Sequence, residues 1–192
     1  MSLLINGTRP EVVKVNGVDA QTVTANGTVV WEAYSGPPSP VIITASGDYT
    51  AGIDFPANKE LNIQVLGAGG EGGWGDAFHY GSGGGAATLS SGNKTYSYNT
   101  VVSAVVGPSD SSDSNFDGIA STGGSAGSSP TGSNVPGEPG ANSVWGSGGA
   151  GGSWGNNGSL GGIGAGGGGG GSATYNTSGG NGGRGEIRIS WS

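Results

Sequence analysis

The chain has 192 residues, of which 46 are glycine, and it carries a formal net charge of −7 with no cysteine. The lack of cysteine excludes a disulfide framework and thiolate metal sites, and the acidic charge argues against nucleic acid as a partner, because no basic stripe is present to neutralise phosphates. No apolar stretch approaches the roughly 20 residues that cross a bilayer, so we expect no membrane insertion.

Residues 1–34 are predicted to form a β-meander. Asn-Gly pairs recur at ten-residue spacing, beginning at Asn6, Asn16 and Asn26, and such pairs supply the positive φ angles that a type I′ hairpin needs. The expected strands are residues 11–15, 21–24 and 28–31. So short a segment buries little core by itself. We therefore expect it to attach the chain to other proteins, or to copies of itself, for example as a homotrimer.

A proline-rich segment at 35–40 is predicted to be a stiff, extended hinge, because proline fixes its own φ and keeps the preceding residue out of the α region. It divides the N-terminal module from a second domain at 41–192. Alternating apolar residues predict strands there, and we expect one strand from each end of this domain to close a common sheet. The predicted strands are residues 41–44, 49–55, 61–66, 86–89, 95–106 and 186–191.

Glycine opens every triplet from Gly146 to Gly170. A period of three matches neither an α-helix nor a strand but fits polyproline II geometry, in which bare faces let neighbouring rods exchange backbone hydrogen bonds. One rod of this length would span about 78 Å, far more than the radius of gyration of about 15 Å for such a domain. It must therefore reverse, and 154–160 is the expected place. Shorter rods are predicted at 67–75, 81–85, 123–127 and 179–185.

The predicted fold is therefore mainly β and irregular, with essentially no α-helix. An N-terminal β-hairpin module precedes a small β-platform, and the platform holds a packed lattice of polyglycine II helices. Disorder is the alternative for so glycine-rich a chain, but the strand patterns and the 5 tryptophans argue against it.

Motifs that resemble catalytic signatures lack the context that their chemistry requires. A GxGxxG pattern begins at Gly67 but no helix former follows, and two GxSxG patterns, around Ser125 and Ser153, have no strand-to-helix turn. The sole histidine, His79, lies in a separate loop. Paired carboxylates for glycan cleavage have no favourable spacing, so a depolymerase is the weak enzymatic alternative. We predict no enzyme, no cofactor and no resident metal.

An acidic loop contains Asp110, Asp113 and Asp117 among serines. Carboxylate and hydroxyl oxygens suit calcium, but the EF-hand spacing is absent. A solvated polar loop is the favoured interpretation and calcium binding the alternative.

Aromatic residues gather where loop tips are expected. Rigid rings beside Asn, Ser and Thr are typical of recognition surfaces, while some rings, Trp74 and Trp154 first, are expected to cap the ends of the glycine rods. The candidate receptor-binding residues are Phe78, His79, Tyr80, Trp145, Tyr175 and Asn176.

The order of motifs in 41–192 resembles the glycine-rich domain of phage tail and tail-fibre proteins. The resemblance rests on a strand ending at Leu66, the glycine burst after it, Ser114-Asn115-Phe116, and a closing strand from Gly185 to Trp191. The distal tail-fibre adhesins of T-even-like phages are similar too, and that likeness implies polyglycine helices whose tip loops bind host receptors. The short N-terminal hairpins depart from those adhesins, which carry a larger attachment domain.

The resemblance implies a virion tail component that is released by lysis, since the start of the chain shows no signal peptide. Residues 1–34 would dock onto tail or fibre proteins, and the loops would bind a host cell-surface glycan or an outer-membrane protein. The alternative is a purely structural tail-tip, baseplate or capsid-decoration protein. Ice binding also uses triplet glycine packing, but the irregular aromatic loops argue against it.

Overall fold

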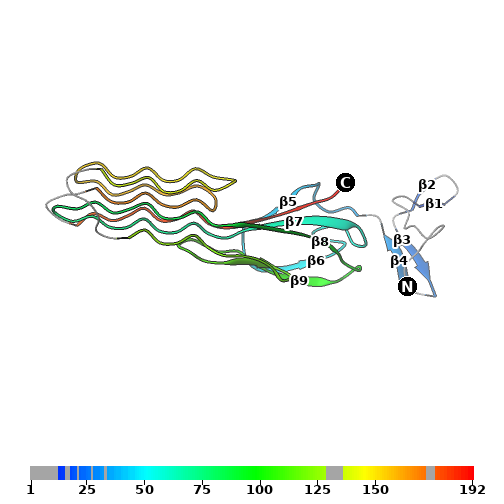
Figure 1. Cartoon of the computed structure of the whole chain (residues 1–192). Helices are drawn as coiled ribbons and strands as arrows, with labels where there is room; N and C mark the ends of the chain where they lie inside the picture. The colour runs from blue at the N-terminus through cyan, green and yellow to red at the C-terminus, as the bar shows by residue number, and fades with distance from the viewer. Residues whose placement is uncertain are drawn as a thin grey trace.

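The computed structural model describes residues 13–15, 18–20, 22–26, 28–32, 34–128, 136–171 and 176–192. Within these ranges every regular element is a β-strand, and all pairs of strands are antiparallel. Strands, a polyglycine lattice and connecting loops make up the domain after residue 40 (Figure 1). The predicted fold class is confirmed.

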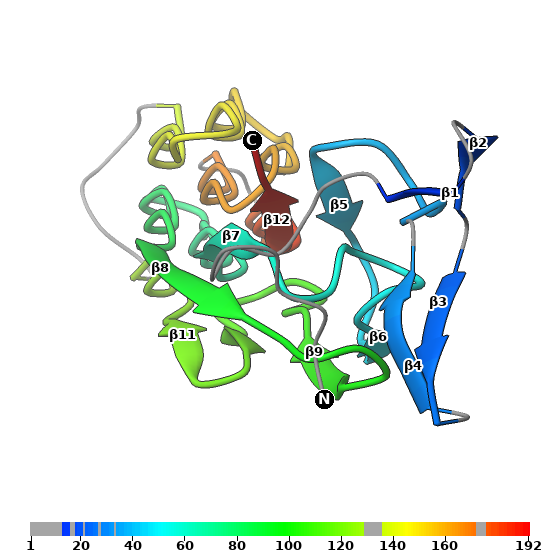
Figure 2. The same ribbon diagram turned by 90° about the vertical axis from the view of Figure 1, so that its right-hand side faces the viewer.

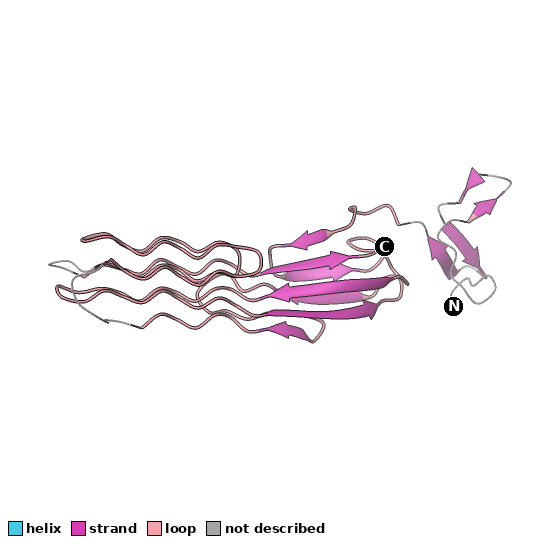
Figure 3. Cartoon of the chain, turned by 45° about the horizontal axis from the view of Figure 1, so that its top comes forward, coloured by secondary structure: helices cyan, strands magenta, loops and turns pink. Residues whose placement is uncertain are grey.

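Two four-stranded sheets pack face to face (Figure 3). The first has the order β5-β12-β7-β8 and the second β11-β10-β9-β6. The strands of the first sheet are β5 (Val41–Ile43), β7 (Glu60–Leu66), β8 (Leu89–Thr95) and β12 (Glu186–Ser190). Those of the second are β6 (Gly47–Thr50), β9 (Val101–Val105), β10 (Ser114–Phe116) and β11 (Ile119–Ser121).

The prediction that strands from both ends of the domain share a sheet is confirmed. The C-terminal strand β12 lies between β5 and β7, with Ile187 opposite both Ile43 and Val65. Alternate residues point inward, so Ile187 and Ile189 are fully buried and Trp191 packs against the same core. Burial of such side chains stabilises the sandwich by about 1.5–3 kcal/mol each.

Three expected strands differ in extent from what the sequence pattern indicated. The strand predicted at 49–55 stops at Thr50, because Asp54 accepts the Thr50 amide at 2.7 Å and closes a turn. The one predicted at 95–106 is interrupted by a reversal at Asn99, which has a φ of 62°. Residues 86–88 belong to a glycine rod, and β8 begins at Leu89.

The N-terminal module contains two antiparallel pairs, β1 (Lys14–Val15) with β2 (Val18–Asp19) and β3 (Thr22–Ala25) with β4 (Thr28–Glu32). Asn26 has a φ of 51°, as the predicted hairpin requires. The strand β2 was not predicted, and the Asn6-Gly7 and Asn16-Gly17 turns lie outside the described residues. Figures 1 and 3 place these strands beyond the sheets, on the side away from the lattice.

The segment predicted as a hinge packs against the second domain. Tyr34 donates to the carbonyls of Pro37 at 2.9 Å and Asp54 at 3.1 Å, and its ring meets Trp191 edge-on at 5.6 Å. Burial, with a further contribution from the charge of Asp54, raises the pKa of Tyr34 to about 12. The junction is therefore a contact rather than a free linker.

The lattice consists of eight extended rods in the described residues, joined by backbone hydrogen bonds. In chain order they are rod 1 (67–75), rod 2 (81–88), rod 3 (122–128), rod 4 (136–143), rod 5 (146–153), rod 6 (156–163), rod 7 (165–171) and rod 8 (177–185). Strands β7 and β11 run directly into rods 1 and 3, and rods 2 and 8 run into β8 and β12. The long triplet run is thus folded into rods 5, 6 and 7, with the predicted reversal near Trp154 and a second one at Gly164.

Rod 7 is the centre of the lattice. It exchanges backbone hydrogen bonds with rods 1, 2, 4, 5, 6 and 8, and those six also bond to one another in a closed ring. Figure 2 looks along the rods, each seen end-on as a small triangular coil. Rod 3 lies outside this ring, against rods 1 and 2.

A surrounded rod has no face on which a side chain fits, so its sequence is six consecutive glycines, residues 166–171. A Cβ added there would meet a neighbour's carbonyl oxygen at 1.9 Å for Gly166, 1.9 Å for Gly167, 2.0 Å for Gly168 and 1.9 Å for Gly169. Ring rods have one face outside, and in rod 1 every third residue is accordingly not glycine: Ala68, Glu71 and Trp74.

Candidate recognition surface at the distal end of the lattice

Successive rods run in opposite directions, so turns fall alternately at two ends of the lattice. The end remote from the sheets, here called the distal end, carries the loop after rod 1 and the turn after rod 5 (Figure 1). The turns after rods 4 and 6 lie at the end that faces the sheets, here called the sheet end. This alternation decides which predicted site residues can share a surface.

The loop Asp76–Tyr80 at the distal end is held by one carboxylate. Asp76 Oδ1 accepts the amides of Phe78 and His79, both at 2.9 Å, and lies 2.8 Å from His79 Nδ1. The Asp76 amide donates to the His79 carbonyl at 2.8 Å. The Phe78 amide, together with His79, holds the pKa of Asp76 below its usual value. The carboxylate is therefore ionised at neutral pH and able to accept these bonds, and the loop presents Phe78, which is 67% exposed.

Two further predicted residues lie at this end. Tyr80 directs its hydroxyl to Glu138 of rod 4 at 3.4 Å, and Asn176 is exposed immediately before rod 8. Tyr175 lies outside the described residues. The distal end thus gathers Phe78, His79, Tyr80 and Asn176 from two connections.

Trp74 and Trp154 do not cap the rods as buried rings. Trp74 is 45% exposed near the end of rod 1, and Trp154 is 57% exposed in the turn after rod 5. Both add aromatic surface to the distal part of the lattice, which sequence reasoning assigned mainly to other residues. For Trp74 the triplet pattern was the available signal, because an outer rod leaves every third position facing outward.

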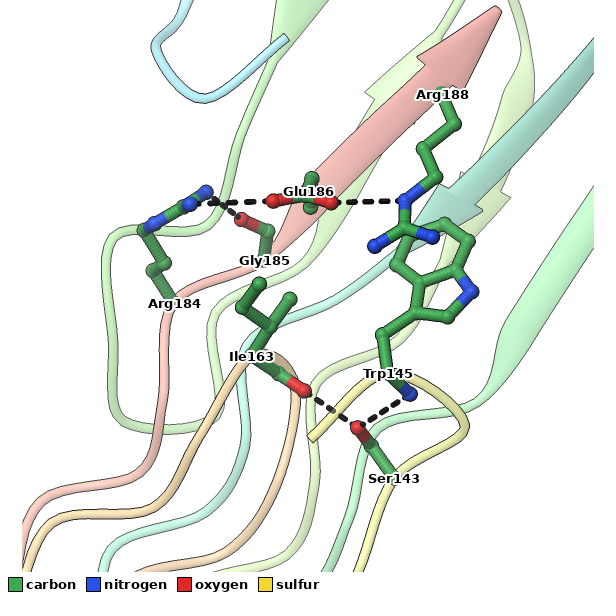
Figure 4. Close-up of polar contacts among 7 residues, drawn as sticks. All are labelled: Ser143, Trp145, Ile163, Arg184, Gly185, Glu186 and Arg188. Carbon is green, nitrogen blue, oxygen red and sulfur yellow. Dashed lines mark hydrogen bonds and ion pairs between the residues drawn. The ribbon is translucent and has the colours of Figure 1, made fainter. Parts of the chain in front are cut away.

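Trp145, which was predicted as a receptor-binding residue, does not lie with the distal loops. Trp145 lies in the turn after rod 4, at the sheet end, where the guanidinium of Arg188 stacks over its ring with the Cζ atom 4.0 Å from the centroid (Figure 4). The Trp145 amide donates to Ser143 Oγ at 3.1 Å, and Ser143 Oγ donates in turn to the Ile163 carbonyl. The ring is half-buried and joins the lattice to β12.

The same junction holds a buried carboxylate. The side chain of Glu186 is 3% exposed and bridges two arginines, accepting from Arg184 Nη2 at 3.1 Å and from Arg188 Nε at 2.9 Å. Burial of a carboxylate is tolerated when charged donors satisfy its oxygens.

The acidic loop uses its carboxylates in separate structural bonds. Asp110 and Asp113 accept backbone amides of the lattice, while Asp117 accepts the Tyr96 hydroxyl at 3.0 Å and pairs with Lys94 at 3.2 Å. Within the described ranges no group of three acidic or histidine residues comes together to hold a metal ion. The loop acts as an acceptor surface for the lattice.

The motifs that resemble catalytic signatures lie in the lattice. The GxGxxG segment from Gly67 is rod 1, Ser125 is in rod 3, and Ser153 ends rod 5 with its Oγ accepting from Asn156 Nδ2 at 2.7 Å. No helix in the described part of the chain has the length and apolarity to span a bilayer.

No family model matches this chain, and neither does any curated sequence.

Proposed function

We propose that the protein is a tail component of a bacteriophage virion and acts as a receptor-binding adhesin. The supporting observation is the separation of loops and attachment module. The loop Asp76–Tyr80 lies at the distal end of the rods, whereas the described strands of residues 1–34 lie beyond the sheets, on the other side of the domain (Figures 1 and 3). Such a layout suits a protein that docks through one end and contacts a surface through the other.

Rigidity is the physical advantage of the lattice in this role. The loop leaves rod 1 and returns as rod 2, and both rods are bonded to the central rod and to each other. A loop whose ends and interior are already ordered loses little conformational entropy on binding. Several copies on one particle would then convert weak contacts into firm adhesion through their effective concentration.

The distal residues favour contacts by packing and hydrogen bonding. Phe78 offers exposed apolar surface, and His79, Tyr80 and Asn176 offer polar atoms around it. The formal charge of −7 opposes attraction to anionic surfaces by charge alone. The expected partners are a glycan or an outer-membrane protein of the host cell, with tail or fibre proteins bound by residues 1–34.

Binding of the purified, fluorescently labelled chain to a broad panel of bacterial strains tests this proposal. Phe78→Ala should lower binding to a recognised strain at least tenfold, because it removes the most exposed ring of the distal loop. Val144→Ala is the matched control: Val144 is similarly exposed, at 64%, but lies in the turn at the sheet end. Both variants should melt as the parent chain does.

Equal loss of binding in both variants would contradict recognition through the distal end. Binding to no strain would contradict the adhesin role itself. A third outcome would support the structural alternative instead. In it, Phe78→Ala or Tyr80→Ala lowers the yield of assembled virions, but the virions that do assemble adsorb to cells normally.

A further inference from the structure

A groove runs along the outer side of the lattice, apart from the distal loop. It encloses about 380 Å³ between rods 1, 3 and 8. Rod 3 lies outside the closed ring of rods and so makes a step beside rod 1. The outward positions of rod 1, Glu71 and Trp74, lie in this step, between Ala126 of rod 3 and Ser178 and Gly179 of rod 8.

The chain itself shows which chemistry this side of the lattice binds. Next to the groove, toward the sheets, the loop 108–113 lies across the same three rods, and one outward amide of each rod donates to an oxygen of the loop. The Ala68 amide donates to the Ser112 carbonyl at 2.9 Å, the Gly123 amide to Asp113 Oδ1 at 2.9 Å, and the Gly182 amide to Asp110 Oδ1 at 3.2 Å.

Polyproline II rods repeat every three residues, about 9.3 Å along the axis. One repeat toward the distal end, the equivalent residues are Glu71 in rod 1, Ala126 in rod 3 and Gly179 in rod 8, and all three line the groove. The described residues supply no acceptor for these three amides. The groove therefore repeats a donor arrangement that the loop satisfies in the preceding layer.

The side chains around these amides select among ligands. The indole of Trp74 is 45% exposed, and Glu71 and Ser178, which are also exposed, line the groove beside it. A pyranose ring carries an apolar face that can lie on an indole, and hydroxyls that accept from amides and donate to a carboxylate. The negative charge of Glu71 disfavours an anionic ligand. The volume is at the lower end of the roughly 300–1,000 Å³ typical of small-molecule sites.

We propose that this groove binds a neutral pyranose residue of a glycan. Trp74 supplies the stacking surface, the amides of Glu71, Ala126 and Gly179 donate to ring or hydroxyl oxygens, and the Glu71 carboxylate accepts a hydroxyl hydrogen. The inference rests on the groove and its amides and does not require the tail role or the loop Asp76–Tyr80.

Nuclear magnetic resonance of the ¹⁵N-labelled full chain tests the proposal with defined probes, the methyl glycosides of glucose, galactose, mannose and N-acetylglucosamine. With one of these probes at tens of millimolar, the amide resonances of Glu71, Ala126 and Gly179 should shift, while those of Ala68, Gly123 and Gly182 should not. Trp74→Ala should weaken binding about tenfold. Trp154→Ala, which removes another exposed indole, should leave it unchanged.

Hydrogen exchange checks the open amides independently of any sugar. In the free chain, Glu71, Ala126 and Gly179 should exchange faster than their counterparts one repeat nearer the sheets, because only the counterparts have acceptors. Slow exchange at the three groove amides would mean that the chain itself fills the site, and would overturn the proposal.

Other outcomes would overturn it as well. These are the absence of shifts with every glycoside, or an affinity for the glycoside that is unchanged in Trp74→Ala. Binding of acidic sugars alone, strengthened by Glu71→Gln, would replace the neutral ligand with an anionic one. Failure of cell adsorption in the experiment on Phe78 leaves this result unaffected, so the two proposals can fail separately.

Discussion

The β-sandwich and the lattice of the glycine-rich domain fill their interiors with different material. In the sandwich, aromatic rings meet at the centre, with Phe55 5.5 Å from Tyr96 and 6.0 Å from Phe116 between ring centroids. In the lattice, the central rod has no side chain at all over residues 166–171, and backbone groups fill the space. A side-chain core adjusts its rotamers when its volume changes, whereas a backbone core has no rotamers to adjust. The two regions should therefore respond differently to substitution.

Adding one methyl group to the central rod should have the largest effect. In Gly168→Ala the new Cβ would lie 2.0 Å from the Ala150 carbonyl oxygen and 2.9 Å from that of Gly149. Neither backbone can move without breaking its own hydrogen bonds, so we expect a loss of more than about 3 kcal/mol and no intact lattice. Thermal unfolding followed by circular dichroism, together with limited proteolysis of residues 136–171, measures this.

Gly47→Ala is the control for the central rod, because a Cβ at Gly47 meets nothing within 4 Å. It should be neutral or slightly stabilising, by up to about 1 kcal/mol through the unfolded state. If Gly168→Ala melts at the same temperature as Gly47→Ala, the central rod is not packed on all sides.

Removing a ring from the sandwich should leave the fold intact and lower its stability in a graded way. Phe55 is fully buried, so Phe55→Ala should lower the free energy of unfolding by about 3–5 kcal/mol and Phe55→Leu by clearly less, because the leucine leaves a smaller cavity. Denaturant unfolding of both variants measures the difference. An equal cost for the two substitutions would show that this core is as rigid as the lattice.

The smallest effect is expected at the junction between the two regions. Glu186→Gln removes the charge that Arg184 and Arg188 share, and should cost about 2 kcal/mol. Since Arg188 also covers Trp145, tryptophan fluorescence should then report an earlier unfolding transition than far-ultraviolet circular dichroism.

Glu60→Gln is the control for Glu186→Gln. Glu60 is an exposed carboxylate that accepts from Asn93 at 2.9 Å, and its substitution should change the free energy of unfolding by less than about 0.5 kcal/mol. Coincident transitions in Glu186→Gln would mean that this cluster does not couple lattice and sandwich.

The rods could be predicted from the sequence because their constraint is local. Glycine at every third position indicates which face of a rod lacks side chains. The alternation of Ile187 and Ile189 indicates which face of the last strand is buried. The central position of rod 7 could also have been predicted, because only a rod surrounded on every side needs glycine at all six positions from 166 to 171. That distinction was missed because the period of three was read across the whole run from Gly146.

The position of Trp145 could not be predicted because rod 4 was not recognised. Its residues 136–143 contain only two glycines in register, Gly137 and Gly140, beside prolines and polar residues. An overlooked rod hides one change of chain direction, so the sequence alone did not show at which end of the lattice the turn at Trp145 lies. This residue was grouped with the other aromatic loop tips, although its turn faces the sheets. The junction with Arg188 and the groove beside Trp74 depend on this three-dimensional order and have no short-range signature.

The late position of the central rod in the chain has a consequence for synthesis. A ribosome delivers five of the six surrounding rods before residues 166–171 emerge, so the inward amides and carbonyls of those rods remain hydrated until then. Rod 8 and the strand β12, which lies between β5 and β7, follow later still. A polypeptide that ends before Gly166 would contain five of the six surrounding rods but not the central rod to which they bond. Only chains that extend past this residue can therefore form the rigid lattice.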